Sequence, residues 1–306
     1  MSPKILVVGS ANTDFIVQVP QIPVKGETVL GGVFHTAKGG KGANQAVAAA
    51  RLGADVTLIA RLGTDNLGNE AVAAYREEGV CTDFIARDAE TPSGVALILV
   101  SKTGENIIAV APGANDELSP QDVFQAESAI KEADCLLVQL EIPMETVLAA
   151  ATVASRHKVR VILNPAPASK IPPELFRVVD ILTPNEKEAV GMLGDSYPPD
   201  NTNLLSNLER KTGVKDIIVT LGEKGACVYS NGQETQVSAF QVTPIDTTAC
   251  GDAFNGALAV ALGRGQSLLQ AVRYANAAGA IAATKLGAQP SLPTVKEVEV
   301  LMASQQ

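Results

Sequence analysis

Short apolar runs alternate along this chain with segments of helical periodicity. The apolar runs that we predict as strands are 5–8, 56–60, 135–140, 159–163, 180–182 and 217–220. The helical patterns that separate most of them are 42–51, 67–78, 120–132, 144–156 and 204–212. Because strands that alternate with helices favour parallel pairing, the sequence predicts an α/β fold. Its central, mostly parallel sheet would be flanked by helices on both faces.

Two segments depart from this alternation. Residues 13–36 have the pattern of short strands with Pro and Gly turns, and residues 91–110 that of a hairpin turning at Lys102-Thr-Gly-Glu105. We predict that both segments pair into a small β appendage at the edge of the sheet. The chain shows no internal repeat or obvious linker. Residues 1–306 are therefore predicted to be one α/β domain that carries this discontinuous appendage.

Composition argues against several classes of partner. Hydrophobic residues make up 46% of the chain, enough for a sizeable core. Because the chain has no Trp and only 4% aromatic residues, that core must consist of Ala, Val, Ile and Leu. The net charge of −9 argues against nucleic acid or an anionic membrane surface as a partner. No apolar run approaches the roughly 18 residues of a membrane span, and the N-terminal run is too short for a signal peptide.

The cysteines and histidines lead to two further expectations. The four cysteines form no Cys-x-x-Cys pair, which is typical of free thiols in a reducing cytosol, so we expect a cytoplasmic protein. The two histidines are too few and too far apart to predict a metal site.

Polar residues follow the predicted strands. Those after the first strand are Asn12 and Asp14, and those after later strands are Glu141, Asn164, Asn185, Thr220 and Gly222. Ligands of open α/β sheets bind beyond the carboxyl ends of the strands. One polar residue there means little, because turns and helix caps use the same residue types. Its repetition at five strand ends favours a binding edge.

The glycine-rich stretch Gly39-Gly-Lys-Gly42 lacks the features of two common phosphate motifs. Walker A would require Gly at His35 and Ser or Thr at Gly42, and the first strand ends without a Gly-x-Gly-x-x-Gly fingerprint. A strand–turn–helix remains. Its glycines would let a ligand approach the backbone, and Lys41 and Asn44 would offer donors to hydroxyls. A tight turn before an Ala-rich helix is the alternative.

The stretch from Asp246 to Gly256 is predicted as a loop that becomes a helix at Asp252. The residues before that acid, Ala249-Cys-Gly251, are small, so backbone N–H groups can close around an anion at the helix N-terminus. A carboxylate beside such a cradle suits the removal of a proton from an alcohol as a phosphoryl group arrives. Helix capping alone would also explain Asp252.

These residues carry a resemblance to a known family. Residues 39–46 (Gly-Gly-Lys-Gly-Ala-Asn-Gln-Ala) and 246–256 resemble the two signature regions of the ribokinase family of sugar kinases. Further stretches resemble the same family in the same order, namely Asn164-Pro-Ala-Pro-Ala168, Thr183-Pro-Asn-Glu-Lys-Glu-Ala189 and Gly287-Ala-Gln-Pro-Ser291. The match is collinear over nearly the whole chain.

The resemblance implies a site. Asp252 matches the catalytic base, which also contacts the sugar. The other sugar-binding positions are Asn12, Asp14, Gly40, Lys41, Asn44 and Glu141, and the anion hole is Ala249, Cys250 and Gly251. The ATP positions are Asn185, Thr220, Gly222, Gly251 and Asn276, with Glu188 helping to organise Mg²⁺. A site for K⁺, built largely from backbone carbonyls, is implied at Asp246, Thr248, Ala282, Lys285, Gly287 and Ser291.

The implied reaction is MgATP-dependent phosphorylation of the 5-hydroxyl of D-ribose, giving D-ribose 5-phosphate and ADP. The two appendage segments would form a β lid that excludes water and joins two chains into a homodimer. Deoxyribose, fructose or a nucleoside stay open as alternative substrates, as does a sugar-responsive regulator without catalysis. A dehydrogenase is disfavoured by the missing glycine fingerprint.

One position departs from the family pattern. Cys250 stands where the family usually has Ala or Gly. A buried small residue that leaves the anion hole intact is the favoured interpretation. Because a helix N-terminus lowers the pKa of a thiol, we also test the prediction that Cys250 is the thiol whose alkylation inhibits and which MgATP protects.

Overall fold

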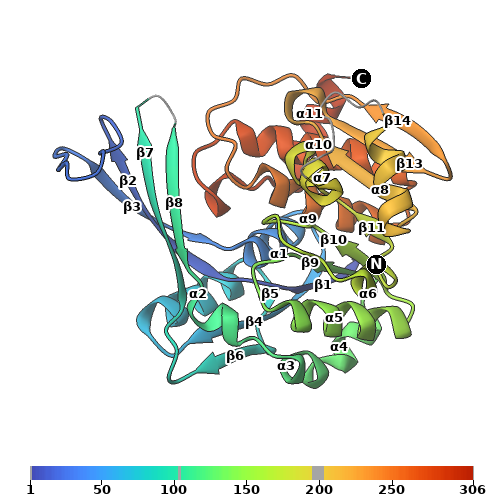
Figure 1. The fold of residues 1–306 in the computed structure, drawn as a ribbon, viewed down its shortest axis with the longest axis horizontal. Helices are drawn as coiled ribbons and strands as arrows, with labels where there is room; N and C mark the ends of the chain where they lie inside the picture. Colours follow the sequence, from blue (N-terminus) through green and yellow to red (C-terminus); the bar gives the residue numbers. More distant parts are fainter. Residues whose placement is uncertain (1, 103–104, 195–202, 306) are drawn as a thin grey trace.

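The computed structural model describes residues 2–102, 105–194 and 203–305. Within these ranges ten strands form a central sheet in the order β14-β13-β12-β11-β10-β9-β1-β4-β5, and β6 also pairs with β4 (Figure 1). The strands are β1 (Lys4–Val8), β4 (Asp55–Gly63), β5 (Val80–Cys81), β6 (Ile85–Asp88), β9 (Cys135–Val138), β10 (Arg160–Leu163), β11 (Ile181–Leu182), β12 (Asp216–Thr220), β13 (Ala226–Ser230) and β14 (Gln233–Val237). Neighbours pair in parallel except along β12–β13–β14, which confirms the predicted, mostly parallel sheet.

Helices cover both faces of the sheet, because its buried strands are apolar on both sides. In β1, Ile5 and Val7 pack into one core and Leu6 and Val8 into the other. The helices of the first core are α1 (Lys41–Arg51), α2 (Asn66–Glu77), α9 (Cys250–Gly263), α10 (Leu268–Ala283) and α11 (Val295–Ser304). Those of the second core are α3 (Pro120–Gln125), α4 (Glu127–Glu132), α5 (Met144–Arg156), α6 (Pro173–Phe176), α7 (Glu186–Leu193) and α8 (Leu204–Thr212).

The predicted helix 120–132 is wrong in one respect, because α3 and α4 are separate helices that meet at Ala126. Val123, Ala126 and Ile130 are all buried in the same core. Their spacing keeps the helical period across the break, so periodicity cannot detect it. The predicted strand 135–140 likewise ends earlier, at Val138.

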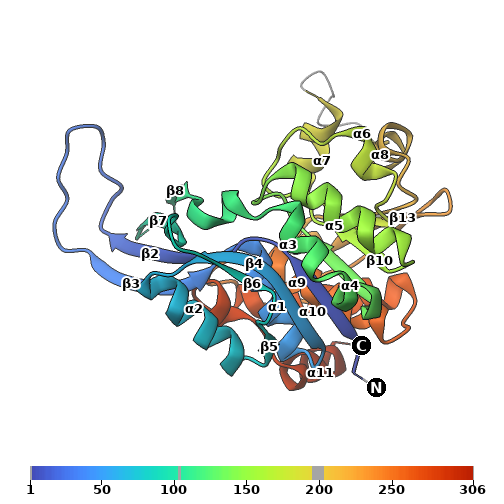
Figure 2. The same ribbon diagram turned by 90° about the horizontal axis from the view of Figure 1, so that it is seen from below.

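The two segments that depart from the alternation form one small sheet in the order β3-β2-β7-β8, which stands away from the body (Figures 1 and 2). Its strands are β2 (Asn12–Val19), β3 (Val33–Gly39), β7 (Gly94–Ser101) and β8 (Asn106–Ala111). The parallel pair β2–β7 joins the two segments. Thr103 and Gly104 of the predicted hairpin turn lie outside the described residues.

Small side chains allow α1 and α9 to approach each other closely. A Cβ on Gly256 of α9 would lie 2.7 Å from the Cβ of Ala48 and 2.9 Å from the carbonyl oxygen of Gln45, both on α1. A side chain at this position would push the helices apart. The contact holds the middle of α9 against α1.

In the part of the chain that the structure describes, no helix is both long enough and apolar enough to cross a membrane. The four cysteines are all free thiols.

Candidate active site

The Asp252 carboxylate lies at the third residue of α9 and is 6% exposed. Asn44 Nδ2 donates to Oδ2 at 2.9 Å, and Gln45 Nε2 donates to Oδ1 at 3.0 Å. Burial raises the pKa of Asp252, while Lys41 and these two amide donors oppose the rise. A buried carboxylate with a raised pKa and fixed orientation has the properties of a general base.

The turn before Asp252 exposes backbone N–H groups. Ala249 adopts a left-handed conformation (φ 58°, ψ 9°), which costs about 1–2 kcal/mol for a residue with a Cβ. Helix α9 begins at Cys250 rather than at Asp252, and the N–H of Ala253 bonds to the carbonyl oxygen of Ala249 at 2.8 Å. The N–H of Cys250 bonds to the Thr247 carbonyl oxygen at 3.3 Å, whereas the N–H groups of Gly251 and Asp252 have no acceptor within the helix. A Cβ on Gly251 would meet nothing within 4 Å, so this turn faces open space and can receive an anion.

Asp14 lies inside strand β2 of the small sheet and not in the loop that follows β1. Burial raises its pKa to about 6, and the nearby carboxylates of Glu141 and Asp252 add to the rise. The Asp14 carboxylate occupies the space over Gly39, where a Cβ would lie 2.3 Å from its Oδ2. The small sheet thus contributes a buried acid to the same site as α9.

Lys41 and Glu141 lie next to each other at the start of α1. Glu141 Oε2 accepts hydrogen bonds from the Lys41 backbone N–H at 3.0 Å and from Ser10 Oγ at 2.6 Å, and Lys41 Nζ is 3.9 Å from Glu141 Oε1. Gly40, the residue before the helix, has φ 86°, a conformation that glycine adopts without strain. Burial acts to lower the pKa of Lys41, but the carboxylates of Asp252, Glu141 and Glu188 raise it on balance.

Buried amide side chains line the edge of this site. Asn12 Oδ1 accepts from Asn115 Nδ2 at 2.7 Å, and Asn115 Oδ1 accepts from the Ala11 N–H at 2.8 Å. Asn44 Oδ1 is buried and has no hydrogen-bond partner in the part of the chain that the structure describes. An unpaired buried acceptor costs about 1–3 kcal/mol, which a hydroxyl donor from a ligand would recover.

Three of the predicted ATP residues lie together at the ends of β11 and β12. Asn185 and Thr220 form a parallel bridge, and Gly222 follows with φ 59°. Asn185 Oδ1 accepts from the Glu188 N–H, and Glu188 Oε2 accepts from the Asn185 N–H, both at 2.8 Å. Asn276 is on α10, and its Nδ2 donates to the Val237 carbonyl oxygen at 2.9 Å.

The residues predicted to bind a monovalent cation come from the end of α10, where Ala282 lies, and from two loops that Asp246 joins. Its carboxylate accepts from the Thr248 hydroxyl at 2.7 Å and from the N–H groups of Gly287 and Thr248, both at 2.9 Å. These bonds hold the pKa of Asp246 low despite burial. The Lys285 N–H bonds to the Ala282 carbonyl oxygen at 3.2 Å. Ser291 is fully buried, and its hydroxyl donates to the Ala288 carbonyl oxygen at 2.7 Å. Within the described ranges no three His, Cys, Asp or Glu side chains are grouped to hold a metal.

The surroundings of Cys250 oppose the expectation of a reactive thiol. Burial raises the pKa of this thiol to about 12, and the carboxylates of Asp246 and Asp252 add to the rise. Burial and two nearby negative charges outweigh the field of the helix N-terminus.

Sequence reasoning missed the polar side chains that lie beneath the site. Gln45, Gln139, Thr183 and Asn255 are buried, and with Asn164 they connect the Asp252 carboxylate to the backbone of α9. Gln45 lies inside the glycine-rich signature, so its position beside Asn44 was the available signal. The other partners come from distant strands.

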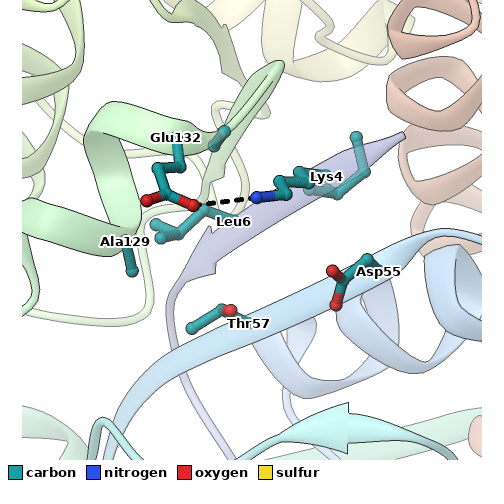
Figure 3. A pocket seen from close by; sticks show the side chains of 8 residues that line it. Lys4, Leu6, Asp55, Thr57, Ala129 and Glu132 are labelled. Carbon is teal, nitrogen blue, oxygen red and sulfur yellow. Dashed lines mark hydrogen bonds and ion pairs between the residues drawn. The ribbon is translucent and has the colours of Figure 1, made fainter. Parts of the chain in front are cut away.

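A surface pocket of about 160 Å³ lies elsewhere, at the opposite edge of the sheet (Figure 3). Its lining includes Lys4, Asp55 and Glu132, at the amino ends of β1 and β4 and on α4. None of the predicted site residues lines this pocket.

Comparisons with known proteins identify the family of this chain. Residues 2–295 match the model of the pfkB family carbohydrate kinases, and the chain belongs to this family. Within that family it is similar to a ribokinase of Haemophilus influenzae, 42% identical over 298 residues that cover 97% of each chain.

Solved structures show the same relationship. The fold is similar to that of Thermotoga maritima ribokinase, with a TM-score of 0.90 and 38% identity over 99% of this chain and 100% of the other. It is also similar to Arabidopsis thaliana ribokinase complexed with ribose and ATP, with a TM-score of 0.88 and 32% identity over 99% of each chain.

Proposed function

We propose that this carbohydrate kinase transfers the γ-phosphoryl group of ATP to the 5-hydroxyl of D-ribose, giving D-ribose 5-phosphate and ADP. The observation that carries the proposal is the buried Asp252 carboxylate at the open N-terminus of α9, beside the unpaired Asn44 Oδ1. Its relatives named ribokinase support ribose as the sugar.

The sugar would bind between the small sheet and α1. Asp14 and Asn44 would orient its hydroxyls, and the remaining sugar contacts would come from Asn12, Gly40, Lys41 and Glu141. Asp252 would accept the proton of the 5-hydroxyl as oxygen attacks the γ-phosphorus. The N–H groups of the turn at Ala249, Cys250 and Gly251 would stabilise the charge that develops on the phosphoryl oxygens. The small sheet would close as a lid and keep water out.

ATP would lie along Asn185, Thr220, Gly222 and Asn276 and end at Gly251. Mg²⁺ usually binds one or two carboxylates, several waters and the phosphates, so a single acid fits this need. The Glu188 carboxylate fits, because it is half-buried and lies near enough to Lys41 and Asp252 for their charges to affect its pKa, which places an acid beside the proposed phosphate site. When bound, Mg²⁺ would neutralise charge on the phosphates.

A monovalent cation, K⁺ rather than Na⁺, would bind among the carbonyls of the two loops joined by Asp246. These loops fit a cation because Asp246 stays charged and α10 directs its carboxyl end toward them. The loop from Asp246 leads directly into the anion-binding turn, so the cation should affect turnover. Initial rates in K⁺, Na⁺ and a bulky organic cation test this, and equal rates in all three contradict it.

The small sheet has the surface of an interface. It leaves large apolar side chains more than half exposed, namely Val33, Phe34, Leu97, Ile107, Ile108 and Val110. An apolar sheet with open edge strands is unfavourable in water, so we propose that two copies pair through it. Sedimentation velocity should find a dimer, and a monomer at the concentrations of the enzyme assay contradicts this.

An ADP-release assay over a panel of sugars tests the substrate. D-ribose should be used best, and 2-deoxyribose should lose about tenfold or more in kcat/KM, because a missing hydroxyl leaves buried polar groups unpaired. Hexoses should be poorer still. Faster turnover of fructose or a nucleoside would overturn ribose but not the kinase activity. Sugar binding without ADP release would instead favour the sugar-responsive regulator.

A further inference from the structure

A closed ring of hydrogen bonds lies beneath the proposed catalytic residues. It begins at the Asp252 side chain and returns to the backbone of the preceding residue, Gly251. The side chains between these two points are Gln45, Asn164, Thr183 and Asn255, which are 0%, 7%, 1% and 1% exposed. They come from α1, from the loops after β10 and β11, and from α9. None of them belongs to the proposed sugar or ATP contacts.

The first arm of the ring holds the carboxylate. Gln45 Nε2 donates to Asp252 Oδ1 at 3.0 Å and to Asn164 Oδ1 at 3.1 Å, so both of its N–H groups are used. Gln45 Oε1 accepts from Gln139 Nε2 at 2.7 Å. An amide that is bonded at all three points cannot rotate without breaking buried hydrogen bonds. Gln45 therefore presents one fixed donor to Asp252.

The second arm holds the anion-binding turn. Asn164 Nδ2 donates to the Thr183 carbonyl oxygen at 3.0 Å, and Thr183 Oγ1 donates to Asn255 Oδ1 at 2.6 Å. Asn255 Nδ2 then donates to the Gly251 carbonyl oxygen at 2.8 Å. That carbonyl belongs to the peptide whose N–H is on Asp252, so this arm fixes the plane of a peptide in the first turn of α9.

We infer that Gln45 and Asn255 are positioning residues, which hold the base and the anion-binding peptide in one fixed geometry. This inference rests on the proposed role of Asp252 as the base. Asn44 also donates a hydrogen bond to Asp252, but as a proposed sugar contact it would bond to the sugar as well. Gln45 makes no proposed contact with the sugar, so its bond to Asp252 should persist when the sugar binds.

The two arms should have different effects on catalysis. A donor to a carboxylate favours its charged form, so loss of Gln45 should raise the pKa of Asp252 and move the acid limb of the kcat profile to higher pH. The charged groups that face Asp252 would remain, namely Lys41 on α1, Glu141 after β9, Asp14 on β2 and Glu188 on α7. Loss of Asn255 removes no bond to the carboxylate and should leave that limb in place.

The test compares Gln45→Met and Asn255→Leu with the wild type, using the sugar that the wild type phosphorylates fastest. Both variants should lower kcat by about tenfold, the effect of one lost buried hydrogen bond, with the Kd for the sugar nearly unchanged. The acid limb should move upward in Gln45→Met alone. Gln45→Glu keeps the shape of the side chain and should move the acid limb to still higher pH. It replaces Gln45→Met in the test if that variant does not fold.

Thr146→Val is the matched control. Thr146 is fully buried on α5, and its hydroxyl donates to the Leu118 carbonyl oxygen at 2.6 Å, outside the ring. This variant should lose stability but keep the kcat profile. An unshifted acid limb in both Gln45 variants, or the same shift in Thr146→Val, overturns the inference. A wild type that phosphorylates another sugar contradicts the ribose proposal and still allows this test.

Discussion

Charged groups have opposite surroundings at the two ends of the central strands, which we call the amino edge and the carboxyl edge of the sheet. At the amino edge, Lys4 Nζ and Glu132 Oε2 form an ion pair at 2.8 Å, with side chains 50% and 68% exposed (Figure 3). At the carboxyl edge, Asp14 and Asp252 are both less than 8% exposed, and each lies among other carboxylates. The amino edge has the surface pocket, whereas the carboxyl edge has the buried charge.

The comparison indicates that buried charged groups and unpaired polar atoms identify a site better than a surface pocket does. An exposed ion pair adds little to stability, since water screens it and already satisfies both partners. Buried carboxylates and the unpaired Asn44 Oδ1 destabilise the fold until a ligand contacts them. A protein retains such groups where they act, so the carboxyl edge is the edge to test.

The largest effect is expected from Asp252→Asn. The amide keeps the shape of the carboxylate but cannot accept the proton, so kcat should fall by about 10²–10⁴-fold with sugar binding nearly intact. Steady-state kinetics and calorimetric titration of the sugar measure the two quantities. Near-normal kcat in the purified variant would remove Asp252 from the role of base and end the contrast between the edges.

Asp14→Asn should weaken catalysis and stabilise the fold. We expect kcat/KM for the sugar to fall by about tenfold or more, because a sugar hydroxyl loses a charged acceptor. The folded-state pKa of about 6 lies above the ordinary aspartate value of 3.8, so ionising Asp14 opposes folding. The free energy of unfolding of the wild type should therefore fall as the pH rises from about 4 to about 6, by as much as about 3 kcal/mol.

Thermal unfolding at several pH values measures this effect. The Asn variant should have a higher Tm than the wild type at pH 8, and the difference should disappear near pH 4, where the wild-type carboxyl is protonated. A lower Tm at pH 8 would mean that Asp14 is already paired, as at the amino edge.

Cys250→Ala should change kcat by less than about twofold, since the thiol makes no charged contact in the proposed mechanism and small residues suit the turn. With a pKa of about 12, little thiolate exists at pH 8, so iodoacetamide should label Cys250 much more slowly than free cysteine. Mass spectrometry of a labelling time course measures this rate. Rapid labelling that parallels loss of activity would contradict it.

The smallest effect is expected at the amino edge, from Lys4→Met. The variant loses the ion pair with Glu132 but keeps the length of the side chain, so kcat and KM should be unchanged and the Tm nearly so. A large loss of activity would show that the pocket in Figure 3 has a role in turnover, and would remove the contrast.

Much of the fold and part of the site could be predicted from the sequence. The alternation of strands and helices, the segments of the small sheet and the residues near Asp252 all depend on local patterns of side chains. Other features depend on partners far along the chain. Gln45 and Asp252 are 207 residues apart, and Ala11 contacts Asn115 across 104 residues. No local pattern identifies such pairs.

The sequence by itself determined the class of fold and the motifs of small and acidic residues, because apolar periodicity and chain flexibility are local properties. Only the tertiary structure decided that the Asp14 carboxylate is buried over Gly39 near Glu141 and Asp252, and that a ring of amides supports Asp252. It also decided the burial and the neighbouring carboxylates that raise the pKa of Cys250. A hydrogen-bond partner or a pKa depends on burial and on the charges nearby, and packing brings these together from elements distant in the chain.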